Sequence, residues 1–294
     1  MRFLFVDRIL QLSPAEYVCG IKHVTFDDHY LCQDGEGKWC FIPSLIGETL
    51  GQLAAWNVML HNDFTARPVA GVVASAHLHR PVYVGETLLL ESFIDALDDA
   101  AVRYHSVARV GDEIVFRIEN ALGPLLPMED FIAPECVRRQ FAEINRPGHW
   151  PLVSPAGIEI LPAAPAQISC ANMSFDRIVS STPGEQLCAE KFINRAASYF
   201  PDHFPNKPVL PMTVLLECKL NLAREFLARA QFTQGYQVRE MRKIKMNDFV
   251  QPGDVIACQL SVKQRDEEEL ILAFRSEVAG KRVCVLEMVL TAEV

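Results

Sequence analysis

The sequence lacks an excess of positive charge. Its 28 lysines and arginines stand against 37 aspartates and glutamates, a formal net charge of −9 at pH 7. A general nucleic-acid binder needs a basic surface, so this balance argues against that class. No apolar stretch approaches the roughly 18 residues of a membrane span, and Asp7 and Arg8 interrupt the apolar start. We therefore expect neither a membrane segment nor a secretory signal.

Cysteine motifs and nucleotide motifs are also absent. The nine cysteines include no Cys-x-x-Cys pair. An odd number of cysteines in a chain of 294 residues favours reduced thiols in a cytoplasmic protein. There is no glycine-rich phosphate loop, no Gly-x-Ser-x-Gly elbow and no zinc-ligand spacing. His77 and His79 share one face of an expected strand but have no third ligand beside them, so we expect no metal site.

The chain repeats itself once. Three landmarks recur in the same order at an offset of 168 or 169 residues, which indicates two copies of one domain. The matched landmarks are residues 5–9 and 174–178, Glu48 and Glu217, and residues 84–86 and 252–254.

The predicted boundaries follow from the repeat and from proline. Residues 1–143 form the first domain, residues 144–167 a proline-rich, semi-extended linker, and residues 168–294 the second domain. All the excess acidity lies before residue 168.

Each copy is expected to hold one long helix followed by strands, an α+β pattern. The helices, 44–61 and 212–231, are apolar nearly all round and must be buried on most sides. A further helical segment is expected at 129–144. The expected strands are 16–24, 69–82, 87–94, 101–110 and 113–121 in the first copy, and 186–194, 236–246, 254–264, 269–277 and 283–292 in the second.

A rigid loop precedes the second helix. Pro205, Pro208 and Pro211 forbid a helix there and favour an extended segment. The loop carries His203, and Glu217 lies in the first turns of the helix that follows. A candidate base and a candidate acid therefore lie on elements stiff enough to position them.

The pattern His-Phe-Pro-x-x-Pro-Val-x-Pro, from His203 through Val209 to Pro211, with Glu217 fourteen residues after the histidine, resembles the active-site signature of the FabA/FabZ 3-hydroxyacyl-acyl carrier protein dehydratases. The resemblance implies two tandem hotdog domains, each a sheet wrapped around a central helix, forming an intramolecular pseudo-dimer. It covers nearly all of both copies outside the linker. The chain departs from the family at Met212, where the family has glycine.

The first copy lacks the histidine, whose slot falls at Asp34 or Gly35. It keeps Glu48 and, on the same helix face, Gln52, which resemble the family's acid and its supporting amide. Because the family's active site pairs histidine and carboxylate across the dimer interface, the resemblance implies one composite site of His203 and Glu48. Glu217 then belongs to a pseudo-site without histidine. The alternative is that Glu48 is only a carboxylate favoured near a helix N-terminus.

The residue types indicate the chemistry of this site. His203, with an ordinary pKa near 6.5, suits abstraction of the C2 proton of a 3-hydroxyacyl thioester. Glu48 must carry a proton to act as the acid, and its apolar neighbours favour that form. A backbone N–H at the start of the second helix suits the enolate oxygen. Met212 is expected to narrow the tunnel or to alter chain-length preference. Glutamate in the acid slot is FabZ-like and favours dehydration to the trans-2-enoyl thioester without isomerisation.

The implied substrate is carried on the phosphopantetheine of an acyl carrier protein or on CoA, in fatty-acid, polyunsaturated-lipid or polyketide-like synthesis, and no cofactor is expected. Two other functions stay open: another hotdog enzyme, such as a thioesterase or enoyl hydratase, and a non-catalytic acyl-carrier-binding subunit. The molecule is expected to be a pseudo-dimeric monomer or a homodimer of double hotdogs.

A basic cluster is the candidate docking surface for an acidic carrier protein. The alternative is a strand edge protected by lysines. The cluster comprises Arg239, Arg242, Lys243 and Lys245.

Overall fold

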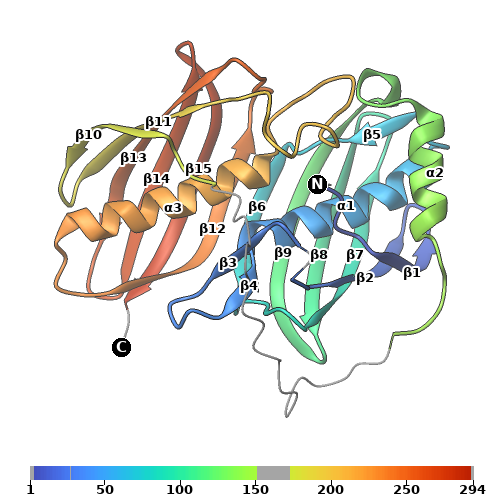
Figure 1. The fold of residues 1–294 in the computed structure, drawn as a ribbon, viewed down its shortest axis with the longest axis horizontal. Helices are drawn as coiled ribbons and strands as arrows, with labels where there is room; N and C mark the ends of the chain where they lie inside the picture. The colour runs from blue at the N-terminus through green and yellow to red at the C-terminus, as the bar shows by residue number, and fades with distance from the viewer. Residues whose placement is uncertain (1–2, 27, 151–172, 293–294) are drawn as a thin grey trace.

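The computed structural model describes residues 3–26, 28–150 and 173–292. Within these residues, thirteen strands form one continuous antiparallel sheet, and two further strands form a small hairpin. Figure 1 shows the sheet behind two long helices. The strands are β1 Arg8–Ser13, β2 Tyr17–His23, β3 Leu31–Gln33, β4 Trp39–Phe41, β5 Ala66–Pro68, β6 Val72–Leu78, β7 Thr87–Leu97, β8 Ala101–Val110, β9 Glu113–Pro127, β10 Arg177–Thr182, β11 Gln186–Phe192, β12 Tyr236–Met246, β13 Val255–Arg265, β14 Glu269–Val278 and β15 Lys281–Ala292.

The sheet has two halves with the same strand order. From one edge to the other the order is β1-β2-β7-β8-β9-β6, then β12-β15-β14-β13-β11-β10. The halves meet where β6 pairs antiparallel with β12, with Ser75 opposite Arg242 and Val73 opposite Ile244. The second half therefore repeats the first in reverse across this junction, as the sequence repeat predicts for a pseudo-dimer.

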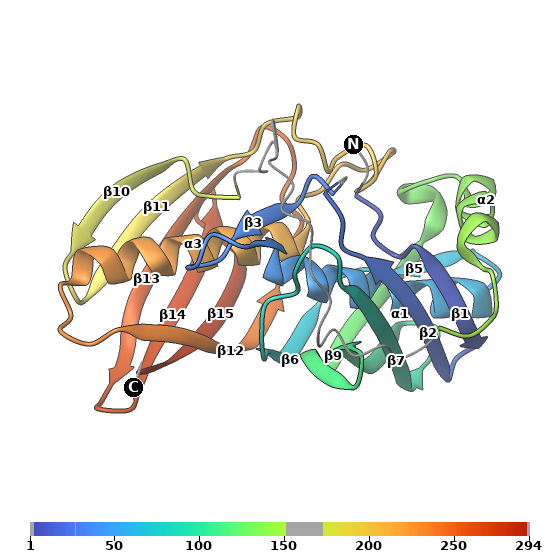
Figure 2. The ribbon, with the colours of Figure 1, turned by 60° about the horizontal axis from the view of Figure 1, so that its bottom comes forward.

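Each half wraps around one helix, as the α+β expectation requires (Figure 2). Helix α1 spans Pro43–His61 and helix α3 spans Met212–Ala230. Proline starts α1 because its fixed φ suits the first turn, and Pro211 stands directly before α3. The two helices are each nearly enclosed, and their apolar side chains enter one large core.

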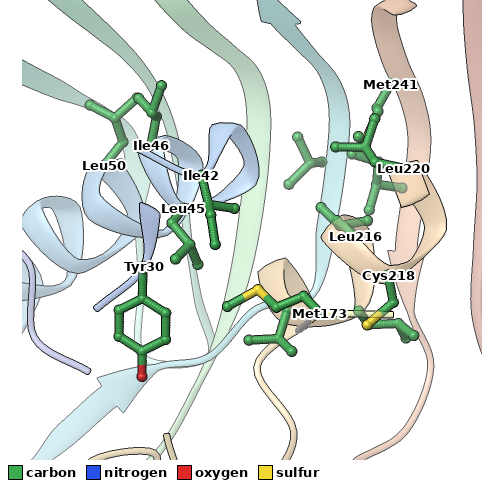
Figure 3. Packing of buried hydrophobic residues seen from close by; sticks show 14 of the residues in the cluster. Tyr30, Ile42, Leu45, Ile46, Leu50, Met173, Leu216, Cys218, Leu220 and Met241 are labelled. Carbon is green, nitrogen blue, oxygen red and sulfur yellow. The ribbon is translucent and has the colours of Figure 1, made fainter. Parts of the chain in front are cut away.

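Figure 3 shows this core where the helices approach each other. Leu45 and Leu50 of α1 are fully buried, and Leu216 of α3 is 6% exposed. Met173, from the segment before β10, lies between the side chains of the two helices in this view and belongs to the same cluster. The halves therefore share a core as well as a sheet.

Several strands differ from the sequence-based expectation. β1, β5, β10 and the β3–β4 hairpin were not expected, because they are short or largely polar and lack a clear alternation. The strand expected at 69–82 is shorter, β6 Val72–Leu78. The segment expected to be helical at 129–144 consists of a 3₁₀ turn, η1 Met128–Asp130, and helix α2 Pro134–Ile144.

Residues 145–150 lie against the first half. The Gly148 N–H donates to the Leu10 carbonyl, and Trp150 contacts the His23 ring at 5.0 Å between centroids. Residues 151–167 of the predicted linker lie outside the described residues, so the domain boundaries stay a prediction. Among the helices that the structure describes, none is long and apolar enough to cross a membrane.

Candidate active site

A cavity of about 940 Å³ is lined by residues from both halves. Its walls come from α1, α3, α2, the loop before α3, and strands that include β6, β9 and β12. His203, from the second half, and Glu48, from the first, both line it. The structure therefore places the predicted base and the predicted acid at one cavity.

The proline-rich loop holds His203 by two hydrogen bonds with Val209, one to the ring and one between backbone groups. His203 Nδ1 lies 2.9 Å from the Val209 carbonyl oxygen, and the Val209 N–H returns a bond to the His203 carbonyl at 3.0 Å. A carbonyl only accepts, so Nδ1 carries the proton and Nε2 is left as a base. The ring stacks on Phe204 at 4.1 Å between centroids and meets the edge of Phe3.

The surroundings keep this imidazole neutral. Burial lowers the pKa of His203 below its ordinary value, and the nearby Arg67 guanidinium lowers it further, while Glu48 and the bond to Val209 act in the opposite direction. The net direction is downward. A neutral imidazole with a free Nε2 is the form that a general base requires near pH 7.

Glu48 is held by two side chains, one from each half. Gln52 Nε2 donates to Glu48 Oε1 at 3.0 Å, one helical turn along α1. Thr213 Oγ1, from the first turn of α3, donates to Glu48 Oε2 at 2.7 Å. The second bond crosses the pseudo-dimer, so the position of the carboxyl group depends on both halves.

Gln52 is itself anchored to the N-terminal segment. Its Nε2 also donates to the Phe3 carbonyl at 3.1 Å, and its Oε1 accepts from the Phe5 N–H at 2.9 Å. An amide with all these partners cannot rotate freely, which orients the group it presents to Glu48. The predicted supporting role of Gln52 is consistent with this geometry.

Met212 is the first residue of α3 and lines the cavity. The N–H of a first helical residue has no intrahelical acceptor and lies at the positive end of the helix dipole. This backbone group is therefore available to an oxygen atom in the cavity. The Met212 side chain forms part of the cavity wall, whereas a glycine at this position would leave that space open.

The pseudo-site holds a second carboxyl group in a different setting. Glu217 is 3% exposed, and burial raises its pKa above the ordinary value, although the Arg224 charge, at 4.0 Å, lowers it. The Ser44 N–H lies 3.4 Å from Glu217 Oε2. In place of Gln52, the second half has Asn221, which donates to the Met173 carbonyl.

The hairpin β3–β4 occupies the place of the missing histidine loop. Asp34, in the vacant slot, accepts from the Tyr83 hydroxyl at 2.9 Å and from backbone N–H groups of its own turn. Cys32 and Cys40 face each other across the hairpin with sulfurs 3.5 Å apart. Glu217 thus meets a hairpin that carries no histidine.

The structure adds three cavity residues that the sequence analysis did not identify, namely Thr213, Arg67 and Tyr104. Thr213 has a sequence signal, because Ser44 stands 169 residues before it at the equivalent helix start. Burial and the Glu48 charge raise the pKa of Tyr104 to about 12. Neither Tyr104 nor Arg67 belongs to a recognisable motif, since β8 and β5 reach the cavity only through the fold.

The predicted docking cluster lies on β12 and is partly neutralised. Arg242 and Lys243 both bind Glu287 of β15, at 3.1 and 3.0 Å, and Lys263 joins them. Burial opposes ionisation of Glu287, yet these cations lower its pKa to about 2. Arg239 instead donates to the Thr291 hydroxyl, and Lys245 is exposed.

Comparison with known proteins agrees with this geometry. The ApeI-like family model, for ApeI dehydratase, matches residues 179–286. A 3-hydroxyacyl-(acyl-carrier-protein) dehydratase FabZ of Wolbachia pipientis is 31% identical over 114 residues, 38% of this chain and 80% of the relative.

Solved structures match the whole fold. The dehydratase domain of PpsC from Mycobacterium tuberculosis, in complex with C12:1-CoA, has a TM-score of 0.57 at 11% identity, covering 98% of both chains. A hotdog-fold protein from Alicyclobacillus acidocaldarius has a TM-score of 0.53 at 8% identity, covering 99% of this chain and 98% of that one. These likenesses show a hotdog fold across both halves of the chain. Together with the identity to FabZ, they show that the chain belongs to the FabA/FabZ-type dehydratase family and is an enzyme of the hydro-lyase class.

Proposed function

We propose that the protein removes water from 3-hydroxyacyl thioesters at a single composite site formed by His203 and Glu48. The observation that carries the proposal is the bond from Thr213 to Glu48, which ties the carboxyl group of the first half to the helix that follows the histidine loop of the second. Both side chains line the same cavity, which is large enough for an acyl chain.

The reaction follows from the two groups. His203 Nε2 takes the proton from C2 of the substrate, while a protonated Glu48 gives its proton to the C3 hydroxyl, which leaves as water. The double bond forms between C2 and C3. The proton gained by His203 and the one lost by Glu48 are then exchanged with solvent, which restores the starting state.

The start of α3 supports this reaction electrostatically. Negative charge develops on the thioester oxygen as the C2 proton leaves. The Met212 N–H, at the positive end of the α3 dipole, is oriented before the reaction begins, so it stabilises that charge with little reorganisation. The Met212 side chain beside it restricts the shape of the acyl group that fits.

The carboxyl group of Glu217, in the pseudo-site, has no histidine partner in the neighbouring hairpin. Glu217 lies beside a hairpin without histidine, and its acceptor contacts come from the Ser44 N–H and the Arg224 charge. We propose that this site is inactive and that the substrate reaches only the composite site, carried on the pantetheine arm of an acyl carrier protein.

The test is to incubate the protein with a 3-hydroxyacyl carrier protein and to measure the mass of the product. We expect a loss of one water from the parent protein and no loss from His203→Ala or Glu48→Gln under the same conditions. Release of the free acid would instead indicate a thioesterase. An unchanged mass with folded parent protein would indicate a non-catalytic carrier-binding subunit.

A further inference from the structure

Arg67, on the short strand β5, presents a guanidinium group to the cavity that holds His203 and Glu48. Its Nε is buried without a hydrogen-bond partner, and no ion pair reaches the group within the part of the chain that the structure describes. Burial lowers the pKa of Arg67 to about 10, which leaves it charged at neutral pH. Arg67 as a whole is half-buried, and a cation with a buried nitrogen and no ion pair is costly, so this arrangement favours a directly bonded anion that the described part of the chain does not supply.

The ring contacts of Arg67 do not provide that partner. The guanidinium lies 3.8 Å from the centroid of the Phe204 ring, which in turn stacks on His203, and 5.8 Å from that of Phe131. Stacking engages the flat face of the group, whereas its N–H donors point outward from the edge. Phe204 therefore orients the guanidinium and leaves its donors available to the cavity.

Five carboxyl groups line the cavity, those of Glu48, Asp202, Asp34, Glu240 and Asp248, and in the described part of the chain none of them forms an ion pair with Arg67. Both oxygens of Glu48 are taken, one by Gln52 and the other by Thr213. The Glu48 charge acts on Arg67 through space and raises its pKa, but neither a hydrogen bond nor an ion pair joins the two groups. Asp202 accepts the Phe3 N–H, and Asp34 accepts the Tyr83 hydroxyl.

We propose that Arg67 is an anion-binding subsite that receives a carboxylate carried on the acyl chain of the substrate. The guanidinium fork matches a carboxylate by two parallel hydrogen bonds, and the anion neutralises the cation. This inference rests on the proposed dehydratase function and names its substrate class: 3-hydroxyacyl thioesters whose acyl group carries a second, free carboxyl group.

The position of Arg67 assigns the anion to the acyl group rather than to the carrier arm. Arg67 is near enough to His203 and Glu48 for these charges to affect one another. In a phosphopantetheine thioester, two amide units separate the phosphate of the arm from the thioester sulfur. If the thioester lies at His203, the phosphate at the far end of the arm is therefore distant from Arg67. A carboxylate on the acyl chain, on the other side of the thioester, can reach Arg67.

The experiment compares two series of 3-hydroxyacyl pantetheine thioesters of matched length, ending in methyl or in carboxylate. The measured quantity is the ratio of kcat/KM for the carboxylate-ended to the methyl-ended substrate. We expect the parent to prefer the carboxylate at one chain length. Arg67→Met should reduce the ratio about ten- to hundredfold, as expected for a lost charged hydrogen-bond pair. Arg67→Lys should give an intermediate ratio, because it keeps the charge but not the fork.

The control is Arg103→Met, which removes an exposed arginine of the same half that does not line this cavity. Its ratio should equal that of the parent. The proposal is overturned if Arg67→Met leaves the ratio unchanged. It is also overturned if the parent shows no preference for carboxylate-ended substrates. Thermal unfolding should show Arg67→Met at least as stable as the parent, since it removes an unpaired buried cation.

Binding separates this inference from the proposed function. If the parent dehydrates neither series, the dehydratase proposal fails, and calorimetry with unreactive saturated acyl pantetheine thioethers still tests Arg67. Parent protein should then bind the carboxylate-ended thioether more tightly than the methyl-ended one, and Arg67→Met should lose that difference. Equal affinities in the parent would overturn the subsite by itself.

Discussion

Two glutamates at equivalent positions of the repeat have different surroundings. Glu48 receives hydrogen bonds from Gln52 and Thr213 and lines the cavity. Glu217 is almost fully buried, and its pKa is raised by that burial. The same residue type is therefore placed for proton transfer in one half and is enclosed in the other.

The enclosure of Glu217 has a consequence for stability. A carboxyl group whose folded-state pKa is raised stabilises the fold while protonated, and this contribution is lost as the pH rises through the folded pKa. Glu217→Gln is neutral at every pH. We therefore expect the melting temperature of Glu217→Gln to rise relative to that of the parent as the pH increases to neutrality from below about 4.3, the ordinary pKa of glutamate. Turnover should stay within a few-fold of the parent.

Glu225→Gln is the matched control for this measurement. Glu225 lies on the same helix, is exposed and pairs with Arg229 at the surface. A surface pair of this kind contributes little, so the control should show no comparable change with pH. A pH-independent difference for Glu217→Gln, or loss of turnover, would contradict the assignment of Glu217 to an inactive, buried position.

At the scale of elements, β12 has two roles. It joins the halves by pairing with β6, and it contains the four residues of the predicted docking cluster, of which Arg239 lines the cavity. Glu287 of β15 engages Arg242 and Lys243, so the charges that are not paired with it belong to Arg239 and Lys245. Arg239 also lines the cavity, so Lys245 is the better choice for a test, because its reversal leaves both the Glu287 pairs and the cavity wall intact.

Lys245→Glu should weaken docking of an acidic carrier protein. We expect KM for the carrier-bound substrate to rise roughly threefold or more at low salt, and less at high salt, with KM for a small pantetheine thioester nearly constant. Steady-state kinetics on both substrates measures this. Arg103→Glu, on the first half, is the control for a general change in charge. An equal effect on both substrates would remove the docking hypothesis.

At the scale of the whole molecule, the proposed active site draws on both halves. His203 comes from one and Glu48 from the other, and Thr213 bonds across the junction. In the proposed site the first half contributes the acid and its helix, although it has no histidine loop.

The composite site predicts non-additive substitutions. His203→Ala and Glu48→Gln should each lower kcat by about 10²-fold or more, because each removes a general acid or base. The double variant should be little worse than either single one, since the two residues act as a unit. Glu48→Gln is nearly isosteric, and circular-dichroism melts verify that the fold survives. If the fold-loss of kcat in the double variant equals the product of the two single losses, the residues act independently and the composite site is contradicted. Activity that depends on Glu217 instead of Glu48 would contradict it as well.

The sequence by itself determined the repeat, the two central helices and most of the strands around them. These elements are long and strongly patterned: β8 at Ala101–Val110 and β12 at Tyr236–Met246 have the predicted bounds. His203, Glu48 and Gln52 were also predicted as site residues, because their motifs resemble the FabA/FabZ signature, and the spacing along α1 places Glu48 and Gln52 on one helix face. The short strands β1 and β10 were missed, since each is a six-residue strand at an edge of the sheet with a weak pattern of its own, although each pairs with the strand that follows it directly.

Only the tertiary structure decided what surrounds those residues. The bond from Thr213 to Glu48 joins positions 165 residues apart, and no local pattern specifies it. The hairpin β3–β4 stands before α1, where the second half has its histidine loop before α3. Arg67, on a strand of three residues, reaches the cavity because β5 pairs with β9 and Phe204 arrives from the other half. Sequence patterns encode periodicity along one segment, whereas the charge and hydrogen bonding of a cavity depend on which segments the fold brings together.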